Sequence, residues 1–156
     1  MAVERTLILL KPDTLQRGLC GKIIARLEKK GLHIVGMKMM HLDSAKCNEH
    51  YAHLVGKPFF PKLVAFMTSA PVIAMAAEGV EAVKVVRDMC GPTNARNAMP
   101  GTIRGDFALS TQYNIIHASD SVETAGKEVK RFFHDNELFS WERALDSLTV
   151  AEDEKK

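Results

Sequence analysis

Apolar and polar residues follow two periods along the chain, and four segments have the pattern of a strand. Residues 6–10 form a nearly continuous apolar run of strand length, which a proline and an aspartate soon end. In a second segment, Val35, Met37 and Met39 alternate with smaller or polar residues, so we expect these three side chains to pack into the core. The remaining predicted strands are residues 72–77 and 114–118.

Elsewhere, apolar residues recur every three or four positions, the period of a helix with one buried face. Asp43 precedes one of these segments as a capping residue, and Gly31 and Gly56 each follow one, where glycine commonly ends a helix. Asp120 precedes the last helix, with Glu123 three residues on, which predicts a capping box with Asp120 as the N-cap. The predicted helices are residues 19–30, 45–55, 61–67, 82–89 and 122–133.

The order of these elements is strand, helix, strand, helices, strand, helix, strand, helix. It fits an α+β fold of the ferredoxin-like split βαβ type, in which a four-stranded antiparallel sheet is covered by helices on one side. Residues 91–106 carry glycine, proline and asparagine without a period, so we expect a long loop, and such loops tend to be functional. We expect one domain over residues 1–148 and a polar, frayed tail over residues 149–156.

The composition indicates a soluble globular protein with no unusual partner. The chain of 156 residues has a formal net charge of +2, so its charge does not call for nucleic acid or a membrane surface. Its 3 cysteines are widely spaced and form neither a disulfide framework nor a zinc motif, which favours reduced thiols. The apolar run near the N-terminus is too short for a membrane span or a signal peptide. We therefore expect a cytoplasmic location.

His117, near the end of the fourth predicted strand, is the strongest candidate for chemistry. No Walker-type GxxxxGK[ST] and no GxGxxG before a helix occurs, so phosphate would have to be bound by side chains. Ser119, Asp120 and Ser121 crowd His117, and Glu128 follows about two helical turns after Asp120. A nearby carboxylate can fix a histidine tautomer, and a neutral imidazole is a good nucleophile. On residue types alone, a purely structural histidine is nevertheless the more frequent case.

Several longer segments resemble one known family. Residues 114–121 (NIIHASDS) are similar to the active-site signature of nucleoside diphosphate kinases, and residues 5–13 (RTLILLKPD) resemble that family's first strand and its lysine. Residues 50–72 resemble its nucleotide-binding helical pair, and residues 99–108 (MPGTIRGDFA) resemble the segment after its long loop. The similarity runs in register from about residue 4 to about residue 141. Collinear motifs at matching separations make coincidence a poor explanation.

The resemblance implies a kinase that moves the γ-phosphate of a nucleoside triphosphate, usually ATP, to a nucleoside diphosphate in a ping-pong cycle. His117 would accept the phosphate through its Nδ1 atom, and Glu128 with Ser119 would orient the imidazole. Tyr51 would support His117, although a tyrosine on the apolar face of a helix is otherwise a core residue.

The resemblance also implies a set of nucleotide-binding residues. Lys11 would reach the phosphates and the sugar 3′ hydroxyl, a role that a strand-end lysine alone does not suggest. Guanidinium groups suit phosphate, so Arg87 and Arg104 would neutralise the transferring group. Phe59 would stack on the base, and every base offers a π-face, so tolerance of all bases would follow. Leu63 would flank the base, Thr93 would donate to a phosphate oxygen and Asn114 would bind the sugar 3′ hydroxyl.

Mg²⁺ and identical subunits are the further partners that the resemblance implies. The ion rides mostly on the nucleotide phosphates in the family, so we expect no direct protein ligand and a contact from Asp120 through water. The partners would be nucleoside di- and triphosphates and other copies of the chain, most simply in a hexamer. The histidines expected to be structural or at the surface are His33, His41, His50, His53 and His134.

One departure from the family pattern bears directly on the site. Ala118 stands where the family usually has glycine, and alanine resists positive φ, so we expect the backbone beside His117 to differ slightly. Two alternatives to the kinase remain. One is a catalytically weak scaffold of the same family, and the other is a sheet that binds nucleic acid. The latter would need exposed aromatic side chains on its central strands, which carry aliphatic residues and methionine instead.

Overall fold

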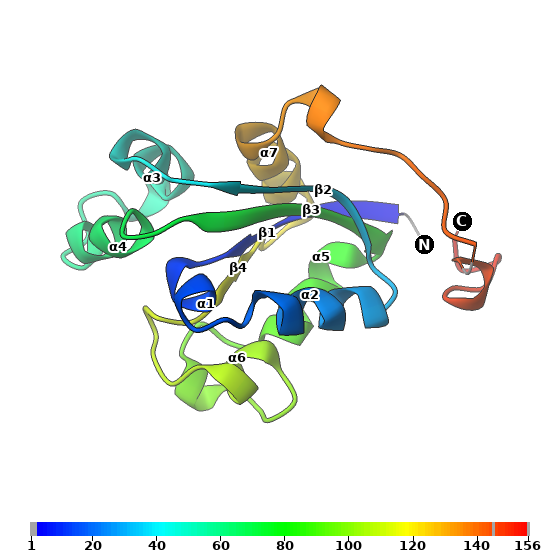
Figure 1. The fold of residues 1–156 in the computed structure, drawn as a ribbon, viewed down its shortest axis with the longest axis horizontal. Coiled ribbons are helices and arrows are strands. Elements are labelled where there is room, and N and C mark those ends of the chain that lie inside the picture. Colours follow the sequence, from blue (N-terminus) through cyan, green and yellow to red (C-terminus); the bar gives the residue numbers. More distant parts are fainter. Residues whose placement is uncertain (1–2, 145, 156) are drawn as a thin grey trace.

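The computed structural model describes residues 3–144 and 146–155, and its four strands form one antiparallel sheet in the order β2-β3-β1-β4 (Figure 1). β1 and β3 pair along the whole of β1, and the short β4 pairs with the other edge of β1. The predicted α+β, ferredoxin-like arrangement is confirmed. The strands are β1 (Val3–Leu10), β2 (His33–Met40), β3 (Val72–Val80) and β4 (Ile116–Ala118).

The helices are short, and within the described residues none is both long and apolar enough to cross a membrane. The α-helices are α1 (Pro12–Gln16), α2 (Cys20–Lys29), α3 (Ser44–His50), α4 (Phe60–Met67), α5 (Ala82–Cys90), α6 (Ile103–Phe107) and α7 (Val122–Phe132). The 3₁₀ helices are η1 (Ala52–Leu54), η2 (Ala95–Asn97), η3 (Asp135–Glu137) and η4 (Asp146–Leu148).

Helices cover both faces of the sheet, and the prediction that they cover one face is wrong (Figure 1). Successive side chains of β1 point to opposite faces. Leu7 and Leu9 pack with α3, α4 and α7, whereas Ile8 and Leu10 pack with α2, α5 and α6. A strand that is buried on both faces has no polar positions to alternate with, and this explains the unbroken apolar run of β1.

A β-bulge in β2 changes the predicted pattern of its side chains. The pairing with β3 shifts between Ile34 and Gly36, so Val35 is an extra residue. Val35 remains buried, but Met37 and Met39 are 55% and 65% exposed, and their predicted place in the core is wrong. A one-residue shift sends every later side chain of a strand to the opposite face. At this edge of the sheet, that face is open to solvent.

The segments that lead into and out of β4 differ from their predicted form. Residues 91–106 hold η2 and most of α6, so they are not an unbroken loop. Ser121, and not Asp120, is the N-cap of α7, since the backbone N–H of Thr124 donates to the Ser121 hydroxyl at 3.0 Å. Asp120 is therefore left exposed beside His117. The fourth strand is shorter than predicted, and this places His117 in the middle of three strand residues.

Candidate active site

A cleft of about 1020 Å³ opens where the ends of β1 and β4 meet α3, α4, α5 and α7. It brings together residues that are far apart in the sequence, because the C-terminal end of β1 lies beside the N-terminal end of β4 and the surrounding helices converge there. Ser119 lies behind the cleft wall and is fully buried. The other predicted site residues all line the cleft: Lys11, Tyr51, Phe59, Leu63, Arg87, Thr93, Arg104, Asn114, His117, Asp120 and Glu128.

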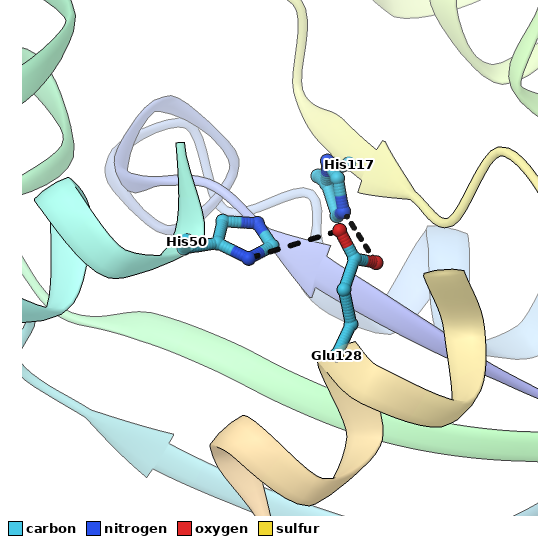
Figure 2. Close-up of side chains that lie close together, drawn as sticks. All are labelled: His50, His117 and Glu128. Carbon is cyan, nitrogen blue, oxygen red and sulfur yellow. Dashed lines mark hydrogen bonds and ion pairs between the residues drawn. The ribbon is translucent and has the colours of Figure 1, made fainter. Parts of the chain in front are cut away.

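His117 lies between Glu128 of α7 and the open cleft. Its Nε2 atom is 3.1 Å from Oε2 of Glu128, and its side chain is 20% exposed. The other ring nitrogen points away from Glu128 (Figure 2). Since an ionised carboxylate only accepts hydrogen bonds, this contact places the proton of a neutral His117 on Nε2. Nδ1 then keeps its free lone pair, which is the form that a nucleophile needs.

Glu128 is buried and accepts two contacts through the same oxygen. The Ser119 hydroxyl donates to Oε2 at 2.6 Å, next to the contact from His117. Ser119 is itself held in place by the backbone N–H of Leu7, which donates to its hydroxyl at 3.2 Å. Burial acts to raise the pKa of Glu128, but the hydrogen bonds and positive potential from His117 and the bond from Ser119 outweigh it. The pKa of Glu128 therefore lies below its usual value, and the group is a carboxylate at neutral pH.

Lys11 follows β1 and is buried in the cleft floor. Its Nζ donates to Oδ1 of Asn114 at 2.6 Å, while the amide nitrogen of Asn114 donates to the carbonyls of Thr93 and Thr111. These bonds use the amide donors and the oxygen separately and so fix which way Asn114 faces. Burial, followed by the nearby charge of Arg104, lowers the pKa of Lys11 to about 8. A cation with an easily lost proton thus stands at the bottom of the cleft.

The lowered pKa of Lys11 predicts a basic limit to activity. Lys11 is charged below about pH 8 and neutral above it, so a cation of the cleft floor is lost as the pH rises. Because kcat/KM reports the free enzyme, we expect it to fall with an apparent pKa near 8. Lys11→Arg stays charged throughout this range and should remove the limb from the profile. A wild-type profile with no basic limb would contradict this prediction.

Arg104 is a buried cation that ties the segment after α5 to β4. It is 5% exposed, and its guanidinium donates to the carbonyls of Gly91 at 2.7 Å, Ile116 at 2.6 Å and Asn114 at 3.2 Å. Three acceptors arranged around one planar group hold it rigidly. Arg104 therefore shapes the cleft floor and also adds to its positive potential.

A strained residue precedes β4 and sets the direction of the strand. Ile115 has a φ of 75°, which is rare for a β-branched side chain. Its N–H donates to Asp13 Oδ2 at 3.0 Å, and its carbonyl accepts from the Thr14 hydroxyl at 2.5 Å and from the N–H of Lys11 at 2.9 Å. Strain of this kind costs about 1–3 kcal/mol and persists only when its surroundings hold it. The sequence did not indicate that Asp13 and Thr14 hold this kink.

Ala118 lies in extended backbone within β4, opposite Ile8. Among the described non-glycine residues, only Glu81 and Ile115 have positive φ. Position 118 therefore does not need glycine in this chain, and alanine is accommodated there without a positive φ. The carbonyl of Ala118 accepts a long, weak hydrogen bond from the guanidinium group of Arg87, at 3.4 Å. The side chain of Arg87 is otherwise exposed in the cleft.

Tyr51 contacts His117 by packing. The two rings are nearly perpendicular, with their centroids 6.3 Å apart. The hydroxyl of Tyr51 is buried and has no hydrogen-bond partner among the residues that the structure describes. Burial raises the pKa of this phenol far above its usual value, so it stays protonated.

Phe59 and Leu63 form the apolar end of the cleft. Phe59 is 49% exposed and Leu63 is buried, so an aromatic face is offered beside an aliphatic wall. Phe60, by contrast, packs into the core. An exposed aromatic ring at the rim of a cleft that carries cations at its floor suits a ligand with a base and phosphates.

His50 belongs to the same cluster, although the sequence indicated only a structural or surface role. It is 3% exposed, and its ring lies edge to face with that of His117, with centroids 4.6 Å apart. Arg131 of α7 also lines the cleft and contacts His50. One feature of the sequence could have indicated this placement of His50. It directly precedes Tyr51, within the segment that resembles a nucleotide-binding helical pair.

Comparisons with known proteins agree with this geometry. Residues 4–138 match the family model for nucleoside diphosphate kinase. A curated nucleoside diphosphate kinase from Parabacteroides distasonis is 56% identical over 140 residues, which are 90% of this chain and 92% of that protein.

Two solved structures are also similar over most of their length. A nucleoside diphosphate kinase from Halobacterium salinarum in complex with CDP is 46% identical, with a TM-score of 0.92 over 94% of this chain and 98% of that one. A Borrelia burgdorferi nucleoside-diphosphate kinase, solved as a transition-state mimic with vanadate and ADP, is 36% identical. Its TM-score is 0.89 over 95% of this chain and 97% of that one.

Proposed function

The chain belongs to the nucleoside diphosphate kinase family and is a phosphotransferase that acts on nucleotides; from this premise we propose that His117 carries the phosphoryl group between the two substrates. One observation carries the proposal. His117 is a partly exposed imidazole in the cleft, and its Nε2 is held by the buried carboxylate of Glu128 while the other nitrogen points away. Such a ring is held in one orientation by its Nε2 atom, and its Nδ1 atom is available to react.

The proposed cycle has two halves. First, the Nδ1 lone pair of His117 forms a bond to the γ-phosphorus of a nucleoside triphosphate. The bond from phosphorus to the β–γ bridging oxygen breaks, and the diphosphate leaves with that electron pair. The proton on Nε2 stays on the ring, where Glu128 stabilises the positive charge that develops. In the second half, a β-phosphate oxygen of another nucleoside diphosphate attacks the phosphorus, and the electrons of the N–P bond return to His117.

Charge neutralisation in this cycle falls to three cations of the cleft. Phosphoryl transfer depends more on alignment and electrostatics than on covalent steps. Lys11 and Arg104 are fixed in the floor, whereas Arg87 is exposed and has a long, weak contact with the carbonyl of Ala118, so it can follow the transferring group. We further propose that Asn114 binds the sugar 3′ hydroxyl and that Thr93, exposed at the cleft, donates to a phosphate oxygen.

The cleft suits a Mg²⁺ ion that arrives bound to the nucleotide, because Asp120 offers an exposed carboxylate there. Within the described part of the chain, the group with metal-ligand spacing is His50, His117 and Glu128. Mg²⁺ prefers oxygen ligands and keeps several waters, so a pair of imidazoles does not suit it. When bound, the ion would neutralise phosphate charge, and we propose that exposed Asp120 contacts it only through water. Asp120→Asn should then weaken the Mg²⁺ dependence of the rate, and an unchanged dependence would contradict this contact.

Phe59→Ala is expected to weaken the binding of every nucleotide to a similar degree. Stacking of one base on an aromatic ring is worth about 1–3 kcal/mol, so KM should rise by about 5-fold or more for adenine, guanine and cytosine nucleotides alike, with kcat little changed. Phe139→Ala, which removes another exposed ring outside the cleft, is the matched control. Steady-state kinetics with several nucleotide pairs measure the effect. A loss confined to one base would speak against stacking by Phe59.

A labelling experiment tests the phosphohistidine itself. The protein is incubated with γ-labelled ATP and no acceptor, and we expect an acid-labile label that moves to GDP when GDP is added. Transfer from ATP to GDP without any protein-bound label would sink the ping-pong cycle. The alternative of a catalytically weak scaffold is not favoured, because the cleft contains the complete set of charged and nucleophilic side chains.

We also propose that the protein forms a homo-oligomer of six subunits in the cytoplasm. The exposed side chains of Met37 and Met39 on the edge strand β2 support assembly, since apolar groups on a sheet edge invite contact with another chain. The free thiols Cys20, Cys47 and Cys90 support a reducing compartment. Sedimentation that gave only a monomer would contradict the assembly, and recovery of the protein in a non-cytoplasmic fraction would contradict the location.

A further inference from the structure

His50 and Arg131 meet directly behind the proposed catalytic pair. The Nδ1 atom of His50 is 3.2 Å from Nη1 of Arg131 and 3.8 Å from Oε1 of Glu128. The side chain of His50 has no exposed surface, and its ring packs against that of His117. Figure 2 shows His50 reaching from α3 toward the carboxylate oxygen of Glu128 that does not face His117.

The contact with Arg131 determines which nitrogen of His50 carries a proton. A guanidinium group has only donors, so this contact favours the tautomer in which Nδ1 of His50 accepts and the ring proton lies on Nε2, although Nε2 is buried and has no hydrogen-bond partner among the described residues. Burial, followed by the charges of His117 and Arg131, lowers the pKa of His50 to about 2, while Glu128 alone among its close neighbours acts to raise it. The exposed His53 adds a smaller effect in the lowering direction. His50 is therefore neutral at every pH at which the protein works.

The other tautomer of His50 would change the catalytic pair. With its proton on Nδ1, the ring would face Oε1 of Glu128 as a donor, and closure of the 3.8 Å gap would draw the carboxylate away from His117. We propose that Arg131 and His50 are positioning residues. An N–H of Arg131 donates to Nδ1 of His50, so this nitrogen cannot itself donate a hydrogen bond to Glu128. The carboxylate of Glu128 therefore remains bonded to His117 and Ser119. The charge of Arg131 has a second partner in Glu49, 3.4 Å away, which keeps it beside His50.

The same cluster does not support a metal site. His50, His117 and Glu128 offer ligand atoms within 4.8 Å of one another, which is a suitable spacing for an ion. However, the guanidinium of Arg131 already contacts the nitrogen of His50 that faces Glu128, and Glu128 is already engaged by His117 and Ser119. An incoming cation would have to break these contacts next to an existing positive charge.

This inference rests on the proposed roles of His117 and Glu128, and kinetics of the full-length enzyme test it. In Arg131→Met, which keeps the apolar stem but not the donors, we expect kcat to fall about 5-fold with an unchanged KM. In His50→Phe, Arg131 loses its acceptor and can turn to Glu128, three residues away on the same helix, so a similar loss is expected. Lys130→Met removes an exposed neighbouring charge and should leave kcat within about 2-fold of wild type.

The double variant separates positioning from simple damage. When both residues are replaced, nothing competes with His117 for Glu128, so we expect Arg131→Met with His50→Phe to recover to within about 2-fold of wild type. Independent structural roles predict the opposite, a loss larger than that of either single variant. A double variant as slow as either single variant, or slower, would overturn the proposal.

A spectroscopic measurement covers the case in which a variant folds poorly. NMR of protein labelled with ¹⁵N-histidine should show His50 protonated on Nε2 in the wild type, and partly on Nδ1 in Arg131→Met. An Nδ1-protonated ring in the wild type, or an unchanged tautomer in the variant, would refute the inference. These results do not depend on phosphorylation. Failure of the phosphohistidine itself would appear separately, as the absence of acid-labile label in the wild type.

Discussion

Replacing His117 with alanine is expected to reduce phosphoryl transfer by about four to six orders of magnitude, since the loss of a covalent nucleophile is among the largest single effects in an active site. The ring supplies the only atom that the proposed cycle uses to hold the phosphoryl group. Its removal leaves the cations and the base-stacking end in place, so nucleotides should still bind with similar affinity. A coupled assay with ATP and a second diphosphate measures the rate, and acid-labile label measures the intermediate.

A matched histidine variant makes this result interpretable. His41 is exposed and lies outside the cleft, so His41→Ala should keep both the rate and the label. Thermal unfolding of His117→Ala should resemble that of wild type, because the ring is partly exposed and its loss creates no large cavity. Label that persists in His117→Ala would place the acceptor on another residue and defeat the mechanism.

Lys11→Met is expected to lower kcat/KM by about 100- to 1,000-fold, the range seen when one preorganised electrostatic contact to a developing negative charge is lost. Methionine matches the length of the lysine stem, so the change removes the cation with little loss of packing. It also leaves Oδ1 of Asn114 without its donor at 2.6 Å, which loosens the residue proposed to bind the sugar. Both consequences act on the same substrate.

Lys22→Met, on the exposed face of α2, is the control for removing one positive charge from the surface. We expect it to change kcat/KM by less than about 2-fold, because exposed charges far from a site are screened by salt. Measuring kcat/KM of both variants over a range of salt concentrations adds a second test. The loss of kcat/KM in Lys11→Met should persist at high salt, where exposed charges are strongly screened. A loss of less than about tenfold in Lys11→Met would show that the buried ammonium is not the main phosphate contact.

The sequence predicted most elements because their causes are local. Each of these features depends on residues close together in the sequence. They are the apolar run of β1, the three-to-four-residue spacing of apolar side chains in α2, α5 and α7, and the cap of α3 by Asp43. The β2 side chains were predicted wrongly because a bulge is a property of strand pairing. Whether helices would cover one face or two also depended on partners that no local pattern names.

For the site, the identity of most residues came from resemblance to a family, and their arrangement came from the fold. The resemblance supplied the set that includes His117, Glu128 and Lys11. It did not indicate that Asp13 and Thr14 would hold Ile115 in a strained conformation, or that His50 would lie against His117. These contacts join residues that are tens of positions apart in the sequence, and the pairing of β1 with β4 brings the start of β4 close to the end of β1.

By itself, the sequence determined most of the strands and helices, the fold class and the family, because periodicity, capping and collinear motifs are written along the chain. Only the tertiary structure decided that both faces of the sheet are covered, that Met37 and Met39 are exposed, and that Ala118 needs no special backbone. It also decided that the guanidinium group of Arg131 lies beside Nδ1 of His50. The physical reason is that burial, hydrogen-bond partners and pKa depend on distances between atoms, and those distances are set by packing between segments rather than by neighbours in sequence.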